Sequence, residues 1–247
     1  MDNHLPIIKT CIFQFFDELK DFLPAQHRTP KLEYSFTQKP SIKDAIQAIG
    51  VPHVDVDVIL VQGKSVDFDF LLSGGEDIEV YPKSSGISGK HLGPDYPEFP
   101  KFIVDVNLGK LVPKLRLLGF DTLYKNDYND HQIVEISNHE NRVILTRDIG
   151  ILKYNAANFG YWVRNTKPYF QAEEVIRKFN LKSKIKPFTR CSVCNGILVL
   201  VEKESIAQSL PQQTREQYKE FTQCESCKKI YWKGSHVKKI LFWIESL

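Results

Sequence analysis

Residues 102–124, FIVDVNLGKLVPKLRLLGFDTLY, combine two apolar runs with a leucine-rich segment between them. Phe102–Val104 predicts a short buried strand that ends at Asp105. The leucines that follow recur at helical spacing, and Pro113 among them should kink this helix or delay its regular start. Phe120–Tyr124 predicts a second strand. A strand, a helix and a second strand in so short a stretch indicate a parallel sheet with a right-handed crossover.

The same alternation continues along the chain. Val143–Thr146 and Tyr161–Val163 predict a third and a fourth strand. A helix carrying Ile133–Ile136 precedes the third strand, and a last helix covers Ala172–Phe179. Residues 101–182 are therefore expected to form an α/β domain with a parallel sheet.

Aspartates follow three of these strands. Asp105 follows the first, Asp130 the second (with Asp127 close by) and Asp148 the third. Open parallel sheets bind ligands beyond the carboxyl ends of their strands. Several carboxylates at one edge repel one another unless a divalent cation lies between them, and oxygen ligands suit Mg²⁺ or Mn²⁺. The alternative is that each aspartate caps the helix that follows it. Asp121 begins its strand and belongs to the opposite edge.

A metal site of this kind supports hydrolysis of phosphodiesters, because bound metal ions lower the pKa of water and neutralise the attacked phosphate. Lys110 and Lys114 are four residues apart in the predicted helix after Asp105, and Arg116 lies at its flank. These side chains are candidates for contacts with substrate phosphates. The alternatives are solubility for the two lysines and a structural role for Arg116.

Four of the five cysteines form a Cys-x-x-Cys pair, 29 intervening residues and a second Cys-x-x-Cys pair: Cys191, Cys194, Cys224 and Cys227. Four thiolates at this spacing predict a closed tetrahedral Zn²⁺ site with a structural role, and Asn195-Gly196 supplies a tight turn. A redox pair would instead open a helix in a thioredoxin-like context, which neither pair does. Cys11 lies alone in an expected strand and reads as a small buried hydrophobe.

The region around these cysteines, residues 183–247, is expected to be a zinc ribbon. Residues 181–240 hold 12 Lys+Arg against 5 Asp+Glu, a local charge of +7, which suits contact with RNA. Tyr231, Trp232 and His236 are candidates for stacking on bases. The alternative for Trp232 is packing in the small ribbon core. A short helix near residues 215–221 is expected to be capped by Thr214 and Gln217.

Residues 1–82 predict two strands, a helix and further strands, which is the pattern of a β-grasp domain. Ser41 and Asp44 form a near capping box at the start of the helix, and Gly50 ends it. Residues 83–100 are rich in proline, glycine and serine and read as a linker. The charge changes sign around this linker, from 9 Lys+Arg against 14 Asp+Glu before residue 96 to 24 against 16 after it.

Composition limits the class of protein. The chain has 247 residues, of which 42% are hydrophobic and 26% charged, so extensive disorder is excluded. No apolar run approaches 18 residues and no signal peptide is evident, so we expect a cytoplasmic protein without a membrane span.

Two resemblances extend these inferences. Residues 58–82 resemble the ubiquitin-like sulfur carriers of molybdopterin and thiamine synthesis, but Gly74-Gly75 is internal, whereas sulfur carriers need it at a free C-terminus. The α/β region and the cysteine ribbon resemble the Mut-seven C-terminal RNase family, a branch of the PIN-like nucleases, many of whose members carry a ubiquitin-like domain in front. The matching positions are Asp105, Leu108, Gly109, Leu111, Leu115, Arg116, Leu118, Gly119, Asp121, Asp130, Thr146, Arg147 and Asp148.

This second resemblance implies a metal-dependent ribonuclease with Asp105, Asp130 and Asp148 as Mg²⁺ or Mn²⁺ ligands. Val112-Pro113 stands where the family usually has Ala-Arg, which removes one basic side chain near the site. We thus expect a β-grasp domain with a protein partner, a PIN-like RNase domain and a zinc ribbon that assists RNA binding. The alternatives are a non-catalytic RNA-binding adaptor and a sulfur-transfer scaffold.

Overall fold

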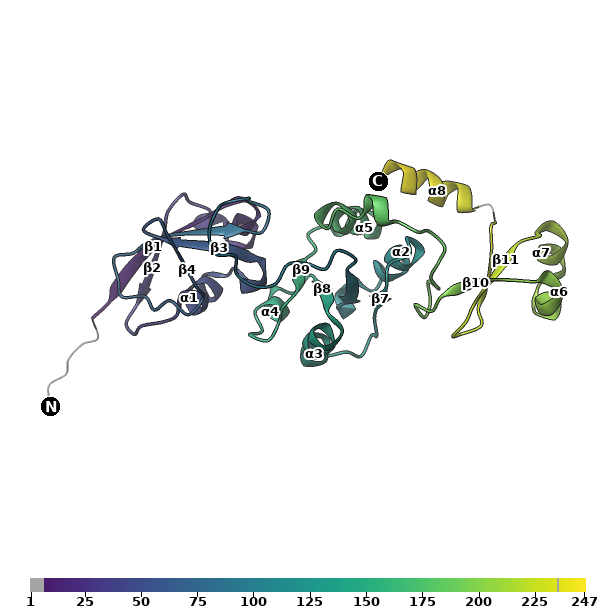
Figure 1. The fold of residues 1–247 in the computed structure, drawn as a ribbon, viewed down its shortest axis with the longest axis horizontal. Helices are drawn as coiled ribbons and strands as arrows, with labels where there is room; N and C mark the ends of the chain where they lie inside the picture. Colours follow the sequence, from purple (N-terminus) through teal and green to yellow (C-terminus); the bar gives the residue numbers. More distant parts are fainter. Residues whose placement is uncertain (1–6, 235) are drawn as a thin grey trace. The chain divides into compact units, whose positions relative to one another are not determined.

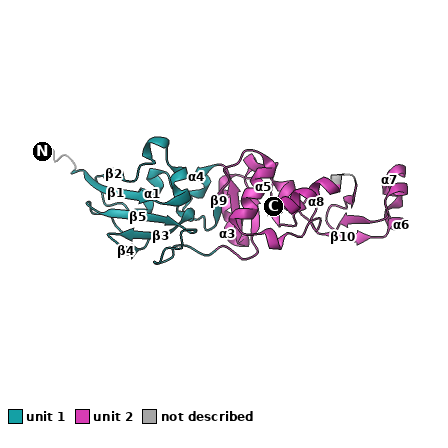
Figure 2. Cartoon of the chain, turned by 90° about the horizontal axis from the view of Figure 1, so that it is seen from above, with its two compact units in different colours: residues 1–95, 148–161 teal, residues 96–147, 162–247 magenta. Residues whose placement is uncertain are grey.

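The computed structural model describes residues 7–234 and 236–247, without the side chain of His236. The chain divides into two compact units, each described separately below (Figure 2). Unit 1 contains the residues before Tyr96 together with Asp148–Tyr161, and unit 2 contains Tyr96–Arg147 and Trp162–Leu247. The segment Asp148–Tyr161, which the sequence places in the α/β region, thus packs with the N-terminal residues.

Unit 1 is built on a mixed sheet near the N-terminal end of the chain (Figure 1). The sheet has five strands in the order β2-β1-β5-β3-β4, all labelled in Figure 2. β1 and β5 are parallel, and the other neighbours are antiparallel. With the helix α1 between β2 and β3 in sequence, this is the predicted β-grasp arrangement. The elements are β1 (Lys9–Phe15), β2 (Leu32–Phe36), α1 (Ile42–Ile49), β3 (Val56–Val61), β4 (Lys64–Val66) and β5 (Asp77–Pro82).

The ends of α1 are those predicted from the sequence. The Ser41 side chain accepts a hydrogen bond from the backbone N–H of Asp44 at 3.1 Å, and Gly50 has a φ of +132° at the C-terminal end. Ile42, Ala45 and Ile46 form its buried face. Residues 83–100, all of which the structure describes, contain neither a helix nor a strand.

The sheet of the α/β region has four strands in the order β7-β6-β8-β9, and β6 is parallel to both of its neighbours. The α/β fold expected from the sequence is confirmed. The strands are β6 (Lys101–Val104), β7 (Thr122–Leu123), β8 (Arg142–Thr146) and β9 (Gly160–Trp162), and the helices are α2 (Val112–Leu117), α3 (Asp130–Glu140), α4 (Ile149–Leu152) and α5 (Pro168–Lys178).

Pro113 delays α2, as expected. A 3₁₀ turn, η4 (Val106–Leu108), follows Asp105, and α2 begins only at Val112, with the proline in its first turn. Proline is tolerated there because the first N–H groups of a helix have no intrahelical partner. The prediction that Lys110 belongs to the helix is therefore wrong, because it lies in the turn before α2.

The C-terminal part of unit 2, as far as the structure describes it, contains an antiparallel sheet, β10-β11-β12, three short helical elements and the longer helix α8. Phe221, Ile206 and Leu210 form its small core. The expected cap by Thr214 is wrong, because α7 begins two residues earlier and follows Pro211. The elements are β10 (Leu198–Val201), α6 (Lys203–Ile206), η6 (Ala207–Ser209), α7 (Gln212–Gln217), β11 (Phe221–Cys224), β12 (Ile230–Trp232) and α8 (His236–Ser246).

No helix in the described part of the chain is long and apolar enough to cross a membrane.

Candidate active site and metal centre

Asp105 lies at the carboxyl end of β6, with only 4% of its surface exposed. Its Oδ2 accepts hydrogen bonds from Thr146 Oγ1 at 2.7 Å and from Asn107 Nδ2 at 3.2 Å. Thr146 is the last residue of the neighbouring parallel strand β8, so both side chains project at the same edge of the sheet. Asp105 makes no side-chain cap to the 3₁₀ turn that it precedes. Its carboxylate is thus held by side chains at the sheet edge.

Asp130 begins α3, which follows β7. It does not cap that helix, because Asn129 does so: Asn129 Oδ1 accepts from the N–H of Gln132, and Gln132 Oε1 accepts from the N–H of Asn129, each at 3.0 Å. The capping alternative for Asp130 is therefore excluded. Its carboxylate lies in the first turn, where the helix dipole favours negative charge.

Asp148 follows β8 by two residues and is exposed. Here the capping alternative applies: Oδ1 accepts a hydrogen bond from the N–H of Gly150 at 2.7 Å, at the start of α4. Asp148 is therefore the N-cap of α4.

The three basic side chains proposed for substrate contact differ in their surroundings. Lys110 is exposed. The ammonium of Lys114 lies 4.2 Å from the centre of the Tyr169 ring, in a cation–π contact. Arg116 is buried, and its guanidinium donates to the carbonyls of Thr122 at 2.9 Å and Val193 at 2.6 Å. Arg116 therefore has the structural role, which is the other role that the sequence allows.

The four ribbon cysteines are brought together. Within residues 7–234 and 236–247, they are the one group of three or more possible metal ligands whose donor atoms all lie within 4.8 Å of one another. Two of the sulfur pairs, Cys191–Cys227 and Cys194–Cys224, are 3.6 and 3.4 Å apart. Tetrahedral zinc with Zn–S bonds of about 2.3 Å spaces its sulfurs about 3.8 Å apart. These separations fit zinc and exclude a disulfide bond, whose S–S length is about 2.05 Å.

The charge state of the cluster also favours a cation. Burial opposes ionisation of Cys191, but hydrogen bonds from Tyr231 Oη, at 3.0 Å, and from two backbone N–H groups outweigh it and lower its pKa to about 6. Burial, together with hydrogen bonding to the other three cysteines, raises the pKa of Cys194 to about 12. Four thiolates so close together need a bound cation to ionise together at neutral pH.

Both cysteine pairs form the same kind of turn. Asn195 and Lys228, each directly after the second cysteine of its pair, have positive φ values of 72° and 60°. A Cβ on Gly196 would lie 2.7 Å from the sulfur of Cys224 and 2.6 Å from Ser226 Oγ. Only glycine fits at this position without displacing a sulfur.

The first turn, Cys191–Gly196, is attached to the α/β sheet. Asn195 Oδ1 accepts from the N–H of Thr122 at 3.0 Å, and Asn195 Nδ2 donates to Asp121 Oδ1 at 2.9 Å. Asp121 also pairs with Arg142 at 2.6 Å and with Arg190 at 3.3 Å. The position of Asp121 just before β7 agrees with the expectation that it belongs to the edge opposite Asp105. The ribbon thus joins the sheet at the edge away from the proposed active site.

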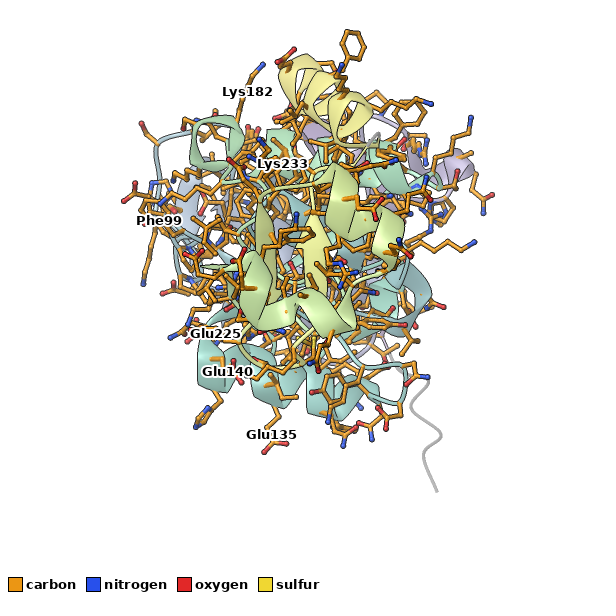
Figure 3. All side chains as sticks on the ribbon, turned by 90° about the vertical axis from the view of Figure 1, so that its right-hand side faces the viewer. Phe99, Glu135, Glu140, Lys182, Glu225 and Lys233 are labelled. Carbon is orange, nitrogen blue, oxygen red and sulfur yellow. The ribbon has the colours of Figure 1, made fainter. Side chains whose placement is uncertain are left out.

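A cavity of about 560 Å³ lies between the ribbon strands and α8. Aromatic and aliphatic side chains dominate its lining, and its charged lining residues are Arg190, Lys233 and Glu220, the last two paired at 3.2 Å (Lys233 is labelled in Figure 3). Trp232 lines the cavity and is 39% exposed, so it is not confined to the ribbon core. The stacking role suggested for His236 concerns a side chain outside the described part.

Cys11 is buried in β1, as expected, but it also has a polar contact. Its Sγ donates to Glu76 Oε2 at 2.7 Å, and Glu76 also accepts from the N–H groups of Ser73 and Gly74. Burial, followed by the hydrogen bond to Glu76, raises the pKa of Cys11 to about 11.

For three contributors to these sites the sequence did not indicate the contact that the structure shows, although Tyr231 was a candidate for base stacking and Asn195 for a tight turn. Asn107 and Tyr231 hold a carboxylate and a thiol of the two candidate sites, and Asn195 links the ribbon to the sheet. Thr146 is part of the Thr-Arg-Asp match, but its hydroxyl contact with Asp105 follows only from the pairing of β6 with β8.

Fold and site together define a ubiquitin-like domain joined to an α/β domain with a four-cysteine ribbon. A family model described as "Mut7-C RNAse domain" matches residues 100–243, and one described as "Mut7-C ubiquitin" matches residues 8–88. The chain therefore belongs to the Mut7-C RNase family, which supports a nuclease role. A search of curated proteins and a search of solved structures each found no match.

Proposed function

We propose that the protein hydrolyses RNA phosphodiester bonds at a Mg²⁺ or Mn²⁺ site formed by Asp105 and Asp148, with Asp130 completing the site or orienting water. The observation that carries this proposal is the buried Asp105 carboxylate, which Thr146 and Asn107 orient at the carboxyl edge of the sheet. Asp130 and Asp148 follow the two neighbouring strands of the same sheet. Membership of an RNase-domain family agrees with it.

The protein residues would act mainly by positioning. The hydroxyl of Thr146 and the amide of Asn107 fix one oxygen of Asp105, so its orientation does not have to be established when substrate arrives. A metal ion held there would supply an activated water and would neutralise charge on the attacked phosphate.

We propose further that the cysteine cluster holds structural zinc and that the ribbon assists RNA binding. With four thiolates, a Zn²⁺ site carries a charge of about −2 and has no open coordination position. The cavity beside Trp232 offers an aromatic face, and the exposed Lys233, which pairs with Glu220 at 3.2 Å, is the candidate for a phosphate contact. Unpaired RNA bases are the ligand that this combination fits best.

The test is cleavage of labelled single-stranded and structured RNA with Mn²⁺ or Mg²⁺. Asp105→Asn and Asp148→Asn should each abolish cleavage. Glu135→Gln, at an exposed position on α3 whose side chain points outward at the lower edge of the view (Figure 3), is the control and should retain it. Equal cleavage by the wild type and both site variants would show that another site or a contaminant is responsible.

The RNA-binding adaptor is the second candidate, because Asp148 caps α4 as an adaptor would allow. It predicts RNA binding that Trp232→Ala weakens, with no metal-dependent cleavage by the wild type. A sulfur-transfer role is disfavoured because Gly74 and Gly75 lie in a turn before β5, where the N–H of Gly75 donates to Thr10 at 2.7 Å. Mass spectrometry that detects no thiocarboxylate would close this alternative.

A further inference from the structure

The segment Asp148–Tyr161 connects β8 to β9, yet it packs within the same compact unit as the ubiquitin-like domain (α4, teal, in Figure 2). Its first residue is Asp148, the N-cap of α4. The four residues of α4 make too short a helix to be stable alone, because nucleation costs more than one turn recovers. Its conformation must therefore come from the residues packed against it.

Polar contacts from α1 and the adjoining turn η3 (His53–Asp55) fix the backbone of this segment. Gln47 Nε2 donates to the carbonyl of Lys153 at 3.2 Å, and Lys153 Nζ donates to the carbonyl of Gln47 at 2.9 Å. His53 Nε2 lies 3.1 Å from the carbonyl oxygen of Ala157. These contacts bridge residues more than 100 positions apart and specify where the segment runs, because each includes a main-chain carbonyl.

The protonation state of His53 follows from its neighbours. Its Nδ1 lies 2.8 Å from Gln47 Nε2, which can only donate, so Nδ1 accepts. Its Nε2 faces a carbonyl oxygen, which can only accept, so Nε2 carries the proton. The imidazole is therefore the neutral Nε2–H tautomer, and Gln47 and His53 form one hydrogen-bonded chain that ends at Ala157.

Apolar packing reinforces these bonds. Val54, next to His53, is buried, as are Leu152 and Phe159 in the segment. A Cβ added to Gly160 would lie 2.4 Å from Leu152 Cδ2 and 3.5 Å from Val54 Cγ2. Gly160 thus lies against Leu152 of its own segment without room for a methyl group, and its position is within ordinary contact distance of Val54 in η3.

We propose that the face formed by Gln47, His53 and Val54 is an intramolecular binding surface whose partner is this chain's own segment Asp148–Tyr161. By holding α4, this surface holds the N-cap Asp148, so Gln47 and His53 are positioning residues for the carboxylate. The positioning role rests on the proposed nuclease function, whereas the binding surface does not depend on it. Use of this face by a separate protein is the competing outcome.

Hydrogen exchange of the full chain, followed by mass spectrometry, tests the binding surface directly. Gln47→Ala and His53→Leu should each make the amides of residues 149–160 exchange about tenfold faster or more, because the contacts that close the segment are lost. Lys64→Ala, at an exposed position in β4, should leave the exchange rates of residues 149–160 unchanged. His53→Gln keeps an amide donor directed at Ala157 and should restore much of the protection.

The exchange of β1 and β3 in the same data reports whether the domain stays folded. If His53→Leu unfolds these strands, the test of the binding surface uses Gln47→Ala alone, because the half-buried Gln47 side chain can be removed with less effect on folding. Unchanged protection of residues 149–160 in Gln47→Ala with intact strands would overturn the proposal. Protection that appears only after another protein is added would assign the face to a separate partner and also overturn it.

Kinetics test the positioning role. In Gln47→Ala, kcat for RNA cleavage should fall about fivefold or more while KM stays unchanged, because orientation of Asp148 is lost and RNA contacts are kept. Faster exchange with unchanged kcat would refute positioning and leave the binding surface intact. Absence of cleavage by the wild type would refute the nuclease function, and the exchange experiment would still decide on the surface.

Discussion

Arg116 Nη1 donates a hydrogen bond to the carbonyl oxygen of Val193 at 2.6 Å, which connects helix α2 to the turn between the first two cysteines. Burial lowers the pKa of Arg116, while the neighbouring Cys194 and Cys191 act in the opposite direction. A zinc-loaded cluster would carry net negative charge, so the buried guanidinium beside it would be balanced. The zinc ribbon and the α/β sheet therefore depend on each other.

Replacing Arg116 with leucine should destabilise both parts. The carbonyls of Thr122 and Val193 would lose their donors, and the expected loss in free energy of unfolding is about 3 kcal/mol. Thermal unfolding and zinc content, measured on the same preparation, check this. Arg177→Leu, an exposed arginine on α5, is the matched control and should leave both unchanged. Normal zinc content and stability in Arg116→Leu would contradict the link.

Zinc removal should loosen the α/β sheet as well as the ribbon. Asn195 donates to Asp121 and accepts from Thr122 only while its turn is closed. Treatment with a chelator should therefore speed hydrogen exchange in β7, which neighbours β6. Exchange in β1 of the ubiquitin-like domain serves as the internal reference. A loss of protection confined to residues 198–232 would mean that the ribbon folds independently.

Gly196→Ala should impair metal binding through geometry alone. Its Cβ would approach the sulfur of Cys224 to 2.7 Å, which is closer than real contacts allow. Gly234→Ala is the matched control in the same ribbon, because its nearest neighbour would be 3.5 Å away, an ordinary contact. We expect zinc affinity to fall at least tenfold in the first variant and to stay constant in the second. A competition titration with a chromogenic chelator measures both.

Thr146→Val should lower RNA cleavage about tenfold through kcat, because the valine keeps the shape of the side chain and removes the hydroxyl that orients Asp105. Thr122→Val is the matched control: Thr122 is equally buried, but its hydroxyl donates to the carbonyl of Phe120. Steady-state rates with Mn²⁺ distinguish them. Equal rates in the two variants would remove Thr146 from the site.

Stability should fall in mild acid because of His53. Burial, with a contribution from Lys43, lowers the pKa of His53 from 6.5 to about 4. Above pH 6.5 the imidazole is neutral in both the folded and the unfolded state, so His53 does not make the free energy of unfolding depend on pH. Between pH 6.5 and 4 only the unfolded state takes up the proton, so stability falls with decreasing pH, by at most about 3 kcal/mol.

Urea unfolding between pH 7.5 and 4.5 measures this effect. The difference between the wild type and His53→Gln isolates the contribution of His53, because glutamine does not titrate. The wild type should lose more stability than the variant over this range. Parallel curves would show that His53 is not held neutral in the folded protein.

Local sequence patterns determined much of this protein. The cysteine spacing indicated the thiol cluster, because ligands separated by two residues within each pair bring four sulfurs together in few ways. Helical spacing with Ser41 and Gly50 located α1, since these signals lie within one turn of the helix ends. They were less decisive for α7, where no side-chain cap operates.

Only the tertiary structure decided the roles that arise between distant residues. From the sequence, Arg116 could contact a phosphate or have a structural role. Its burial and its hydrogen bond to Val193, 77 residues away, give it a structural role. The contact of Gln47 with Lys153 spans 106 residues. No local pattern encodes such contacts, because they depend on how separately formed elements pack, and packing is set by the shape of the whole fold.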